Sequence, residues 1–105
     1  MIHYKPGVRV FGIRPETVLA IQVAHEVYEL YNADLVVTSV IEGSHSRGSL
    51  HYTGQAVDLR LHDRLTVQQH KGVADEIREC LTDDYDVVLE RNHIHIEYQP
   101  KESYT

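Results

Sequence analysis

The sequence has a single cysteine and no long apolar run, and both absences limit what the protein can be. One cysteine, Cys80, excludes an internal disulfide and permits a reducing compartment. Cys80 lies in a helical pattern, where we expect a small core residue rather than a nucleophile. Residues 1–7 lack the apolar stretch of a signal peptide, and no segment approaches the roughly 18 apolar residues of a membrane span. We therefore expect no membrane partner.

Basic residues are also scarce. Ten lysines and arginines stand against sixteen acidic residues, and the formal net charge is -6. Because no basic stripe is present to bind phosphates, we expect no nucleic-acid partner. Proline, glycine and serine form no tract that would mark a linker. The 105 residues are therefore expected to fold as a single domain with a modest core, and the sequence does not indicate protein partners or oligomeric state.

Hydrophobic periodicity predicts a mixed order of helices and strands. Pro15 and Glu16 are typical of a helix start, and this helix should run to about Tyr31. The apolar residues expected on its core face are Leu19, Ala20, Val23, Ala24, Val27, Leu30 and Tyr31. Before and after this helix we expect an extended piece at Val8–Ile13, a central strand at Leu35–Ile41 and a strand ending near Leu61. A second helix, capped by Asp63 or Thr66, should carry Val67 to Leu81. The last two expected strands are Tyr85–Glu90 and His93–Tyr98, joined by Arg91 and Asn92.

Two short segments together offer a full set of zinc ligands. In the first, His51, Gly54, Ala56 and Asp58 follow one another where a loop becomes a strand. Gly54 lets the chain turn or approach another backbone closely, and Ala56 occupies little room beside Asp58. The second segment, His93–Glu97, alternates strictly, so its two histidines face the same side. A catalytic zinc site uses three nitrogen or oxygen ligands and leaves a fourth position open, which two histidines and one aspartate would satisfy.

These segments resemble the zinc site shared by the D-Ala-D-Ala carboxypeptidase family of metallopeptidases (peptidase family M15) and the signalling domain of hedgehog proteins. The family pattern is His-x-x-Gly-x-Ala-x-Asp followed by a terminal histidine segment. Here Ser49-Leu50-His51-Tyr52, Gly54, Ala56-Val57-Asp58 and His93-Ile94-His95 carry it, in the same order, within a similar region of roughly residues 34–98. The resemblance implies an α+β fold: a small antiparallel sheet with helices packed on one face and the metal on the open side.

The resemblance also implies the metal ligands. His51 and Asp58 match the first two ligands of one zinc ion, and His95 matches the third. His93 then matches a residue that either orients a metal ligand or faces the substrate. Glu97 shares the face of His95 and is expected to orient a ligand by a hydrogen bond, as metal-binding histidines usually require.

The catalytic residues follow the family pattern less closely. Glu90 resembles the acid that activates the attacking water, and His45 resembles a hedgehog-type histidine beside the open coordination position. Many bacterial peptidases place the acid three residues before the metal histidine, which counted from His95 falls on Asn92, and the hedgehog-type site places it six before. Glu90 lies five residues before His95. If His93 bound the metal instead of His95, Glu90 would lie three residues before the metal ligand, as in the bacterial peptidases. Of the two histidines, we prefer His95 as the third ligand.

We expect a zinc metallopeptidase that hydrolyses peptide bonds in peptidoglycan stem peptides, as a D-Ala-D-Ala carboxypeptidase or as an endopeptidase. The strand before the site lacks the arginine that the peptidases carry, so either Arg47 or His45 replaces it or the oxyanion is only weakly stabilised. The alternative is a non-catalytic, hedgehog-like scaffold domain stabilised by zinc, which Asn92 and the missing arginine favour. A structural zinc normally takes four protein ligands, however. Without a signal peptide, a cytoplasmic bacterial enzyme or a phage protein released at lysis is expected.

Overall fold

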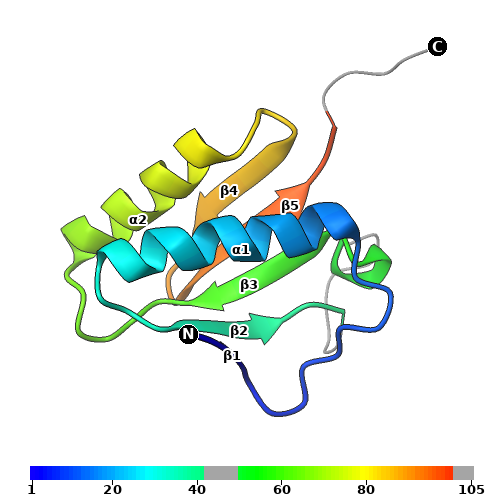
Figure 1. Cartoon of the computed structure of the whole chain (residues 1–105), viewed down its shortest axis with the longest axis horizontal. Helices are drawn as coiled ribbons and strands as arrows, with labels where there is room; N and C mark the ends of the chain where they lie inside the picture. The colour runs from blue at the N-terminus through cyan, green and yellow to red at the C-terminus, as the bar shows by residue number, and fades with distance from the viewer. Residues whose placement is uncertain (42–49, 101–105) are drawn as a thin grey trace.

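The computed structural model describes residues 1–41 and 50–100, which form one five-stranded sheet with two helices packed against it (Figure 1). The expected α+β class is confirmed. Along the chain the elements are β1 (Ile2–Tyr4), α1 (Pro15–Leu30), β2 (Leu35–Ser39), the short 3-10 helix η1 (Leu50–Thr53), β3 (Ala56–Arg60), α2 (Val67–Cys80), β4 (Tyr85–Leu89) and β5 (His93–Tyr98).

The strand order in the sheet is β1-β2-β3-β5-β4. The pairings of β2 with β3, β3 with β5 and β4 with β5 are antiparallel, as expected, and the edge strand β1 adds one parallel pairing with β2. The prediction of an extended piece at Val8–Ile13 is wrong. That segment turns back on itself, with the Ile13 backbone N–H donating to the Val10 carbonyl, and residues 2–4 supply the edge strand instead.

The buried stripe of helix α1 shares Ala20, Ala24 and Val27 with the expected one but is rotated toward Ile21 and Tyr28. Its buried residues recur at helical spacing and are Thr17, Ala20, Ile21, Ala24, Val27 and Tyr28. Leu19 and Leu30, both expected in the core, are 55% and 73% exposed. The alanines on the buried stripe have little side chain, so the helix backbone can lie close to the sheet.

Helix α2 begins where the sequence predicts. The Thr66 hydroxyl accepts from the Gln69 backbone N–H at 3.1 Å, and the Gln69 side chain accepts from the Thr66 N–H at 2.9 Å, which completes a capping box. The expectation for Cys80 is wrong, because this residue is exposed. The helix ends at Cys80, and the next residue, Leu81, turns into the core in its place.

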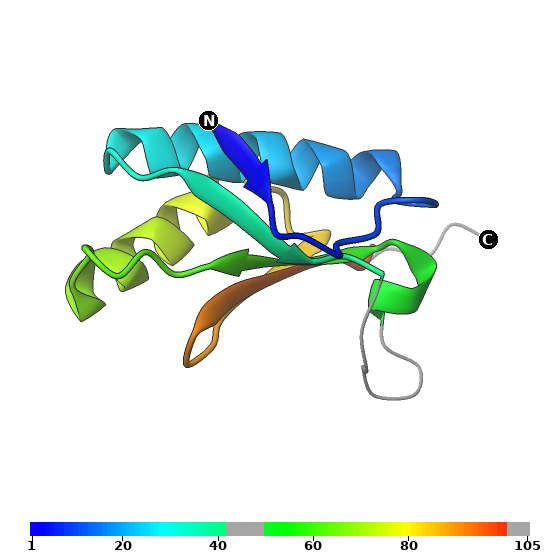
Figure 2. The same cartoon turned by 90° about the horizontal axis from the view of Figure 1, so that it is seen from below.

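Alternation along the strands divides the sheet into an apolar face and a polar face. The side chains buried against the helices are Leu35, Val37, Val57, Leu59, Val87, Ile94 and Ile96. The residues between them point to the other side. Figure 2 shows α1 and α2 on one side of the sheet, and neither of them lies on its other face. The polar residues of β3 and β5 therefore share one open surface.

No helix within the described residues is long and apolar enough to span a membrane.

Candidate metal centre

Asp58 and His95 meet on the open face because of strand register. Asp58 on β3 is paired directly with His95 on β5, and the buried neighbours of each point to the helices. Directly opposite residues in an antiparallel pair have Cβ atoms about 4.5–5.5 Å apart, which places the two side chains in contact. The structure thus brings together residues that lie 37 positions apart in the sequence.

His51 reaches the same point from η1, and a tight contact around Gly54 positions it. The Gly54 carbonyl accepts from the Thr17 hydroxyl at 2.8 Å and from the Arg14 backbone N–H at 3.0 Å, which ties the turn after His51 to the start of α1. Gly54 has a φ of 73°, and an added Cβ would lie 2.2 Å from the Gly12 carbonyl oxygen. Both roles expected of this glycine, a turn and a close backbone approach, are therefore confirmed.

Replacing Gly54 with alanine should displace His51 and destabilise the fold by roughly 2–4 kcal/mol, since the change adds a steric clash to a left-handed backbone conformation. Gly7→Ala is the matched control, because Gly7 has a φ of 92° with nothing within 4 Å of the added Cβ. We expect this control to cost about 1 kcal/mol. Urea unfolding of both variants measures the difference. Equal losses would mean that the Gly12 contact is unimportant.

The carboxylate of Asp58 is the centre of the cluster. Its Oδ1 lies 3.3 Å from Nε2 of His51 and 2.8 Å from Nδ1 of His95. The three ligand atoms all lie within 4.8 Å of one another. His51 is buried at 3% exposure, whereas Asp58 and His95 are 16% and 20% exposed, so the cluster is closed beneath and open to solvent on one side.

The second nitrogen of each imidazole is held by an acceptor. Nδ1 of His51 lies 2.5 Å from the Val40 carbonyl oxygen, and Nε2 of His95 lies 2.8 Å from a Glu97 carboxylate oxygen. A carbonyl and a carboxylate can only accept, so these nitrogens carry the hydrogens. When such an imidazole is neutral, its lone pair is on the nitrogen nearer Asp58, which is the nitrogen that would bind a metal. Histidines that bind metals are held in this way, and Glu97 has the contact expected of it.

The charges at the cluster favour a cation. Burial raises the pKa of Asp58, but hydrogen bonds from His51 and His95, together with the nearby histidine charges, hold that pKa well below its usual range. The hydrogen bond to Asp58 raises the pKa of His95, with burial opposing this and Glu97 adding to it. Between these two carboxylates, the proton on Nδ1 of His95 is therefore favoured. A metal ion would take the place of that proton on Nδ1.

The metal-free protein should lose stability as the pH rises. Because the pKa of His95 is raised in the folded state, its ion pair contributes fully below the unfolded value of about 6.5 and is lost as the pH passes through the folded value. Stabilisation by an added metal should instead grow with pH, since binding releases the proton. Thermal unfolding at about pH 6 and about pH 8, with EDTA or with zinc, tests both signs.

Two variants isolate the contribution of His95 to this pH dependence. His95→Gln should remove the metal-free trend, and His70→Gln, on α2, should keep it. A metal-free Tm that increases over this range, or one that falls equally in His95→Gln, would contradict the assignment.

His93 lies beside the cluster but outside the group of converging ligand atoms. Its Nε2 is 3.6 Å from Oδ1 of Asp58, and its Nδ1 is 2.7 Å from the side-chain oxygen of Asn92. The group within 4.8 Å consists of His51, Asp58 and His95. This geometry favours His95 over His93 as the third ligand.

Glu90 lies on the open face at the end of β4 and is exposed. Its backbone N–H donates to the His93 carbonyl at 2.8 Å, which closes the hairpin with Arg91 and Asn92 at its tip, as expected. Val88 is directly opposite His95, so Glu90 is the diagonal neighbour of His95, roughly 7–8 Å away. Within the part of the chain that the structure describes, the Glu90 carboxylate has no hydrogen bond or ion pair. His45 and Arg47 lie outside the described residues.

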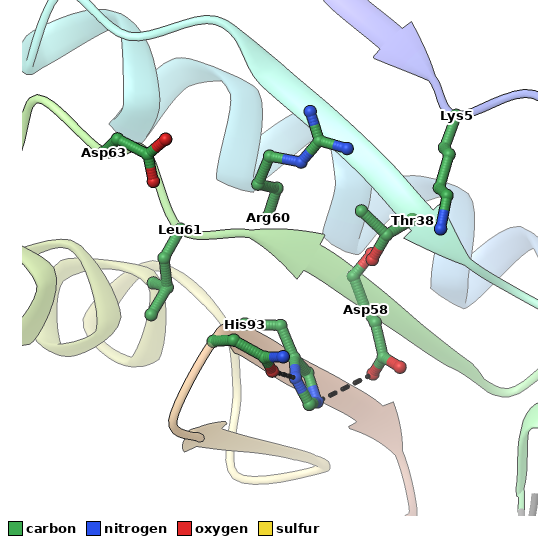
Figure 3. A pocket seen from close by; sticks show the side chains of 8 residues that line it. Lys5, Thr38, Asp58, Arg60, Leu61, Asp63 and His93 are labelled. Atoms are coloured by element: carbon green, nitrogen blue, oxygen red, sulfur yellow. Dashed lines mark hydrogen bonds and ion pairs between the residues drawn. The ribbon is translucent and has the colours of Figure 1, made fainter.

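A pocket of about 520 Å³ opens beside Asp58 and His93 (Figure 3). Its lining includes Lys5, Thr38 and Arg60, none of which we expected from the sequence at this site. Arg60 could have been found, since it lies two positions after Asp58 on the same strand and hence on the same face. Lys5 could not, because no pattern in the sequence indicates the edge strand that places it there.

Comparison with models of known protein families and with curated proteins finds no match to this chain. The evidence on function is therefore the geometry of the site. His51, Asp58 and His95 form a cluster that could hold a metal ion, next to an open pocket.

Proposed function

We propose that the protein is a zinc metallopeptidase that hydrolyses peptide bonds in peptidoglycan stem peptides. The observation that carries this proposal is the convergence of two imidazole nitrogens and one carboxylate oxygen within 4.8 Å, with the other nitrogen of each ring bonded to an acceptor. Three protein ligands with an open side match a catalytic zinc site, whereas a structural site normally has four. The resemblance of the two ligand segments to the D-Ala-D-Ala carboxypeptidase family supports the choice of substrate.

Zinc is the metal that the ligands favour. Two of the three ligands are imidazoles, which suit zinc and other transition metals, while magnesium and calcium prefer a full set of oxygens. Val40 and Glu97 fix the ring orientations before a metal arrives, because each accepts from the ring nitrogen that faces away from Asp58.

The side chains around the cluster have defined roles in the proposed reaction. When bound, zinc polarises a peptide carbonyl and lowers the pKa of water. Glu90 is the proposed base, since an exposed carboxylate on the diagonal from His95 can take a proton and return it to the departing amine. His93 borders the pocket and can orient the peptide. His45 and Arg47 remain candidates to stabilise the developing negative charge.

A non-catalytic scaffold stabilised by zinc is the second candidate, and one observation favours it. Nε2 of His93 lies 3.6 Å from the central oxygen of Asp58, so a small rotation would make His93 a fourth protein ligand and close the site. The exposed Glu90 would then have no part in chemistry.

The His93→Ala variant separates the two candidates. If the site is catalytic, this variant should bind one zinc ion with an affinity within about tenfold of wild type, since it loses no ligand. A fourth ligand would make the loss much larger than the roughly 10- to 100-fold typical of residues that only orient a ligand. Titration with a competing zinc chelator measures the affinity, and His95→Ala provides the reference for a true ligand.

A digest of purified peptidoglycan tests the activity itself. The zinc-loaded protein should release D-alanine or stem-peptide fragments identifiable by mass spectrometry, and removing zinc with a chelator should stop the release. A protein that binds one zinc ion but releases neither product would reject the peptidase and favour the scaffold.

A further inference from the structure

Two polar or charged residues other than tyrosine are buried in the part of the chain that the structure describes, and the fold joins them. These residues are Thr17 and His51, whose exposed fractions are 1% and 3%. Thr17 lies on the buried stripe of α1, where the other residues are alanine, isoleucine, valine and tyrosine. Burying a hydroxyl is costly unless it is hydrogen-bonded, and valine would fill the same space without that cost. Packing alone therefore does not account for the hydroxyl of Thr17.

The Thr17 hydroxyl is linked to the backbone of His51 through a single residue. It donates to the Gly54 carbonyl at 2.8 Å, across 37 positions of sequence, and the Gly54 N–H donates to the His51 carbonyl at 3.0 Å. The Arg14 backbone N–H donates to the same Gly54 oxygen at 3.0 Å, so both of its lone pairs are used. Figures 1 and 2 show the start of α1 and η1 at the same end of the sheet.

The residue after Gly54 is held from the other side, by β5. The Gln55 carbonyl accepts from the Tyr98 N–H at 2.7 Å, and the Gln55 side chain donates to the Tyr98 carbonyl at 3.3 Å. Tyr98 is the last residue of the strand that carries His95. The segment between His51 and Asp58 is therefore fixed both to β5 and to α1, and Thr17 supplies the side-chain contact on the α1 side.

We propose that Thr17 is a positioning residue of the metal centre, which holds η1 so that His51 is already in place before a metal binds. This inference rests on the metal site of the proposed function. A ligand that is held in position loses less conformational freedom on binding than a mobile one, so loss of the contact should weaken metal binding without removing a ligand. Residues that orient a ligand directly contribute roughly 10- to 100-fold to metal affinity, and Thr17 acts through the backbone, so we expect the lower end of this range.

Thr17→Val tests the role of the hydroxyl, because it keeps the shape of the side chain. The Gly54 carbonyl retains the bond from the Arg14 N–H, so the variant should fold. Its affinity for zinc, measured by titration with a competing chelator, should fall about tenfold. Thr17→Ser keeps the hydroxyl and should bind zinc about as tightly as the wild type.

Tyr28→Phe is the matched control. Tyr28 is buried on the same helix, and its hydroxyl donates to the Arg60 carbonyl at 2.9 Å, so this change also removes one hydrogen bond from α1 to a backbone carbonyl. Arg60 ends β3, at the opposite end of that strand from η1. Urea unfolding of the metal-free proteins should show comparable losses of stability for Thr17→Val and Tyr28→Phe, whereas the zinc affinity of Tyr28→Phe should be unchanged.

Three results would overturn this role of Thr17. These are wild-type zinc affinity in Thr17→Val, an equal loss of affinity in Tyr28→Phe, and an equal loss in Thr17→Ser. If Thr17→Val does not fold, Thr17→Ala and Thr17→Ser give the same comparison, because both lack the methyl group and they differ in the hydroxyl.

The outcomes for Thr17 and for the peptidase are distinguishable, because the affinity measurement uses zinc alone. Unchanged affinity in Thr17→Val rejects the positioning role and leaves the peptidase standing. A wild type that binds zinc but releases no product from peptidoglycan rejects the peptidase and leaves the affinity comparison intact. A wild type that binds no zinc rejects both.

Discussion

Asp58→Asn should abolish zinc binding at micromolar metal and, with it, the proposed peptidase activity. Oδ1 of Asp58 lies within 3.3 Å of Nε2 of His51 and 2.8 Å of Nδ1 of His95, so it is the atom that both histidines share. Asparagine keeps the shape of the side chain but removes the negative charge, and zinc prefers a carboxylate as its oxygen ligand. The loss should exceed the roughly 10- to 100-fold typical of residues that orient a ligand. Calorimetry with zinc and the peptidoglycan digest measure both effects.

Glu97→Gln is the control for this prediction, because it should weaken zinc binding only in part. Glu97 contacts the outer nitrogen of His95 at 2.8 Å and is not one of the converging ligands. Its replacement should weaken zinc binding by roughly 10- to 100-fold without abolishing it. Circular dichroism should show both variants folded, because neither side chain belongs to the apolar core. Stoichiometric zinc in Asp58→Asn would mean that the metal binds elsewhere.

The sequence predicts most of the elements that carry the site, because their signals are local. Strict alternation in His93–Tyr98 gives the face of His95 and Glu97, and the cap at Thr66 gives the start of α2. The spacing from His51 to Asp58 predicts a loop that leads into a strand. The strand is β3, and the segment before it forms the short 3-10 helix η1. Each of these features depends on a few neighbouring residues.

What the sequence does not predict depends on contacts across the chain. The register that pairs Asp58 with His95 is set by the packing of one sheet face, and the Val40 carbonyl that orients His51 has no side-chain signal at all. Strand β1 has only three residues and a parallel partner, so its alternation is too short to recognise. For that reason, the sequence does not indicate that Lys5 lines the pocket.

Because the cluster lies on the open face of the sheet, a small domain can accommodate these polar and charged side chains without placing them in its apolar core. Asp58, His95 and Glu97 lie at strand positions that alternate with buried apolar residues, and His51 comes from η1, so the helix-covered face stays apolar. Burying charged groups is costly unless they are paired, and here each histidine pairs with an acceptor on one side and with Asp58 on the other. The same pairing fixes the geometry that a metal requires.

Glu90→Gln should lower the rate of peptide hydrolysis by roughly 100- to 10,000-fold, the usual contribution of a positioned base, while zinc binding stays unchanged. Glutamine keeps the size of the side chain and cannot accept a proton. Glu90 is exposed and its carboxylate makes no hydrogen bond or ion pair within residues 1–41 and 50–100, so the fold should not depend on it. Rates on a blocked D-alanyl-D-alanine peptide, measured with zinc content confirmed for each sample, test this directly.

Because of the position of Glu90, this prediction is the strictest test of the proposed peptidase mechanism. As the diagonal neighbour of His95, roughly 7–8 Å away, its carboxylate has to extend over Val88 to reach the open side of the cluster. Val88 is 42% exposed, and no ion pair holds Glu90 elsewhere among the described residues. Glu79→Gln, an exposed acid on α2, should leave the rate unchanged. If Glu90→Gln matches this control while zinc remains bound, the base is another group and Glu90 is only a charge on the hairpin.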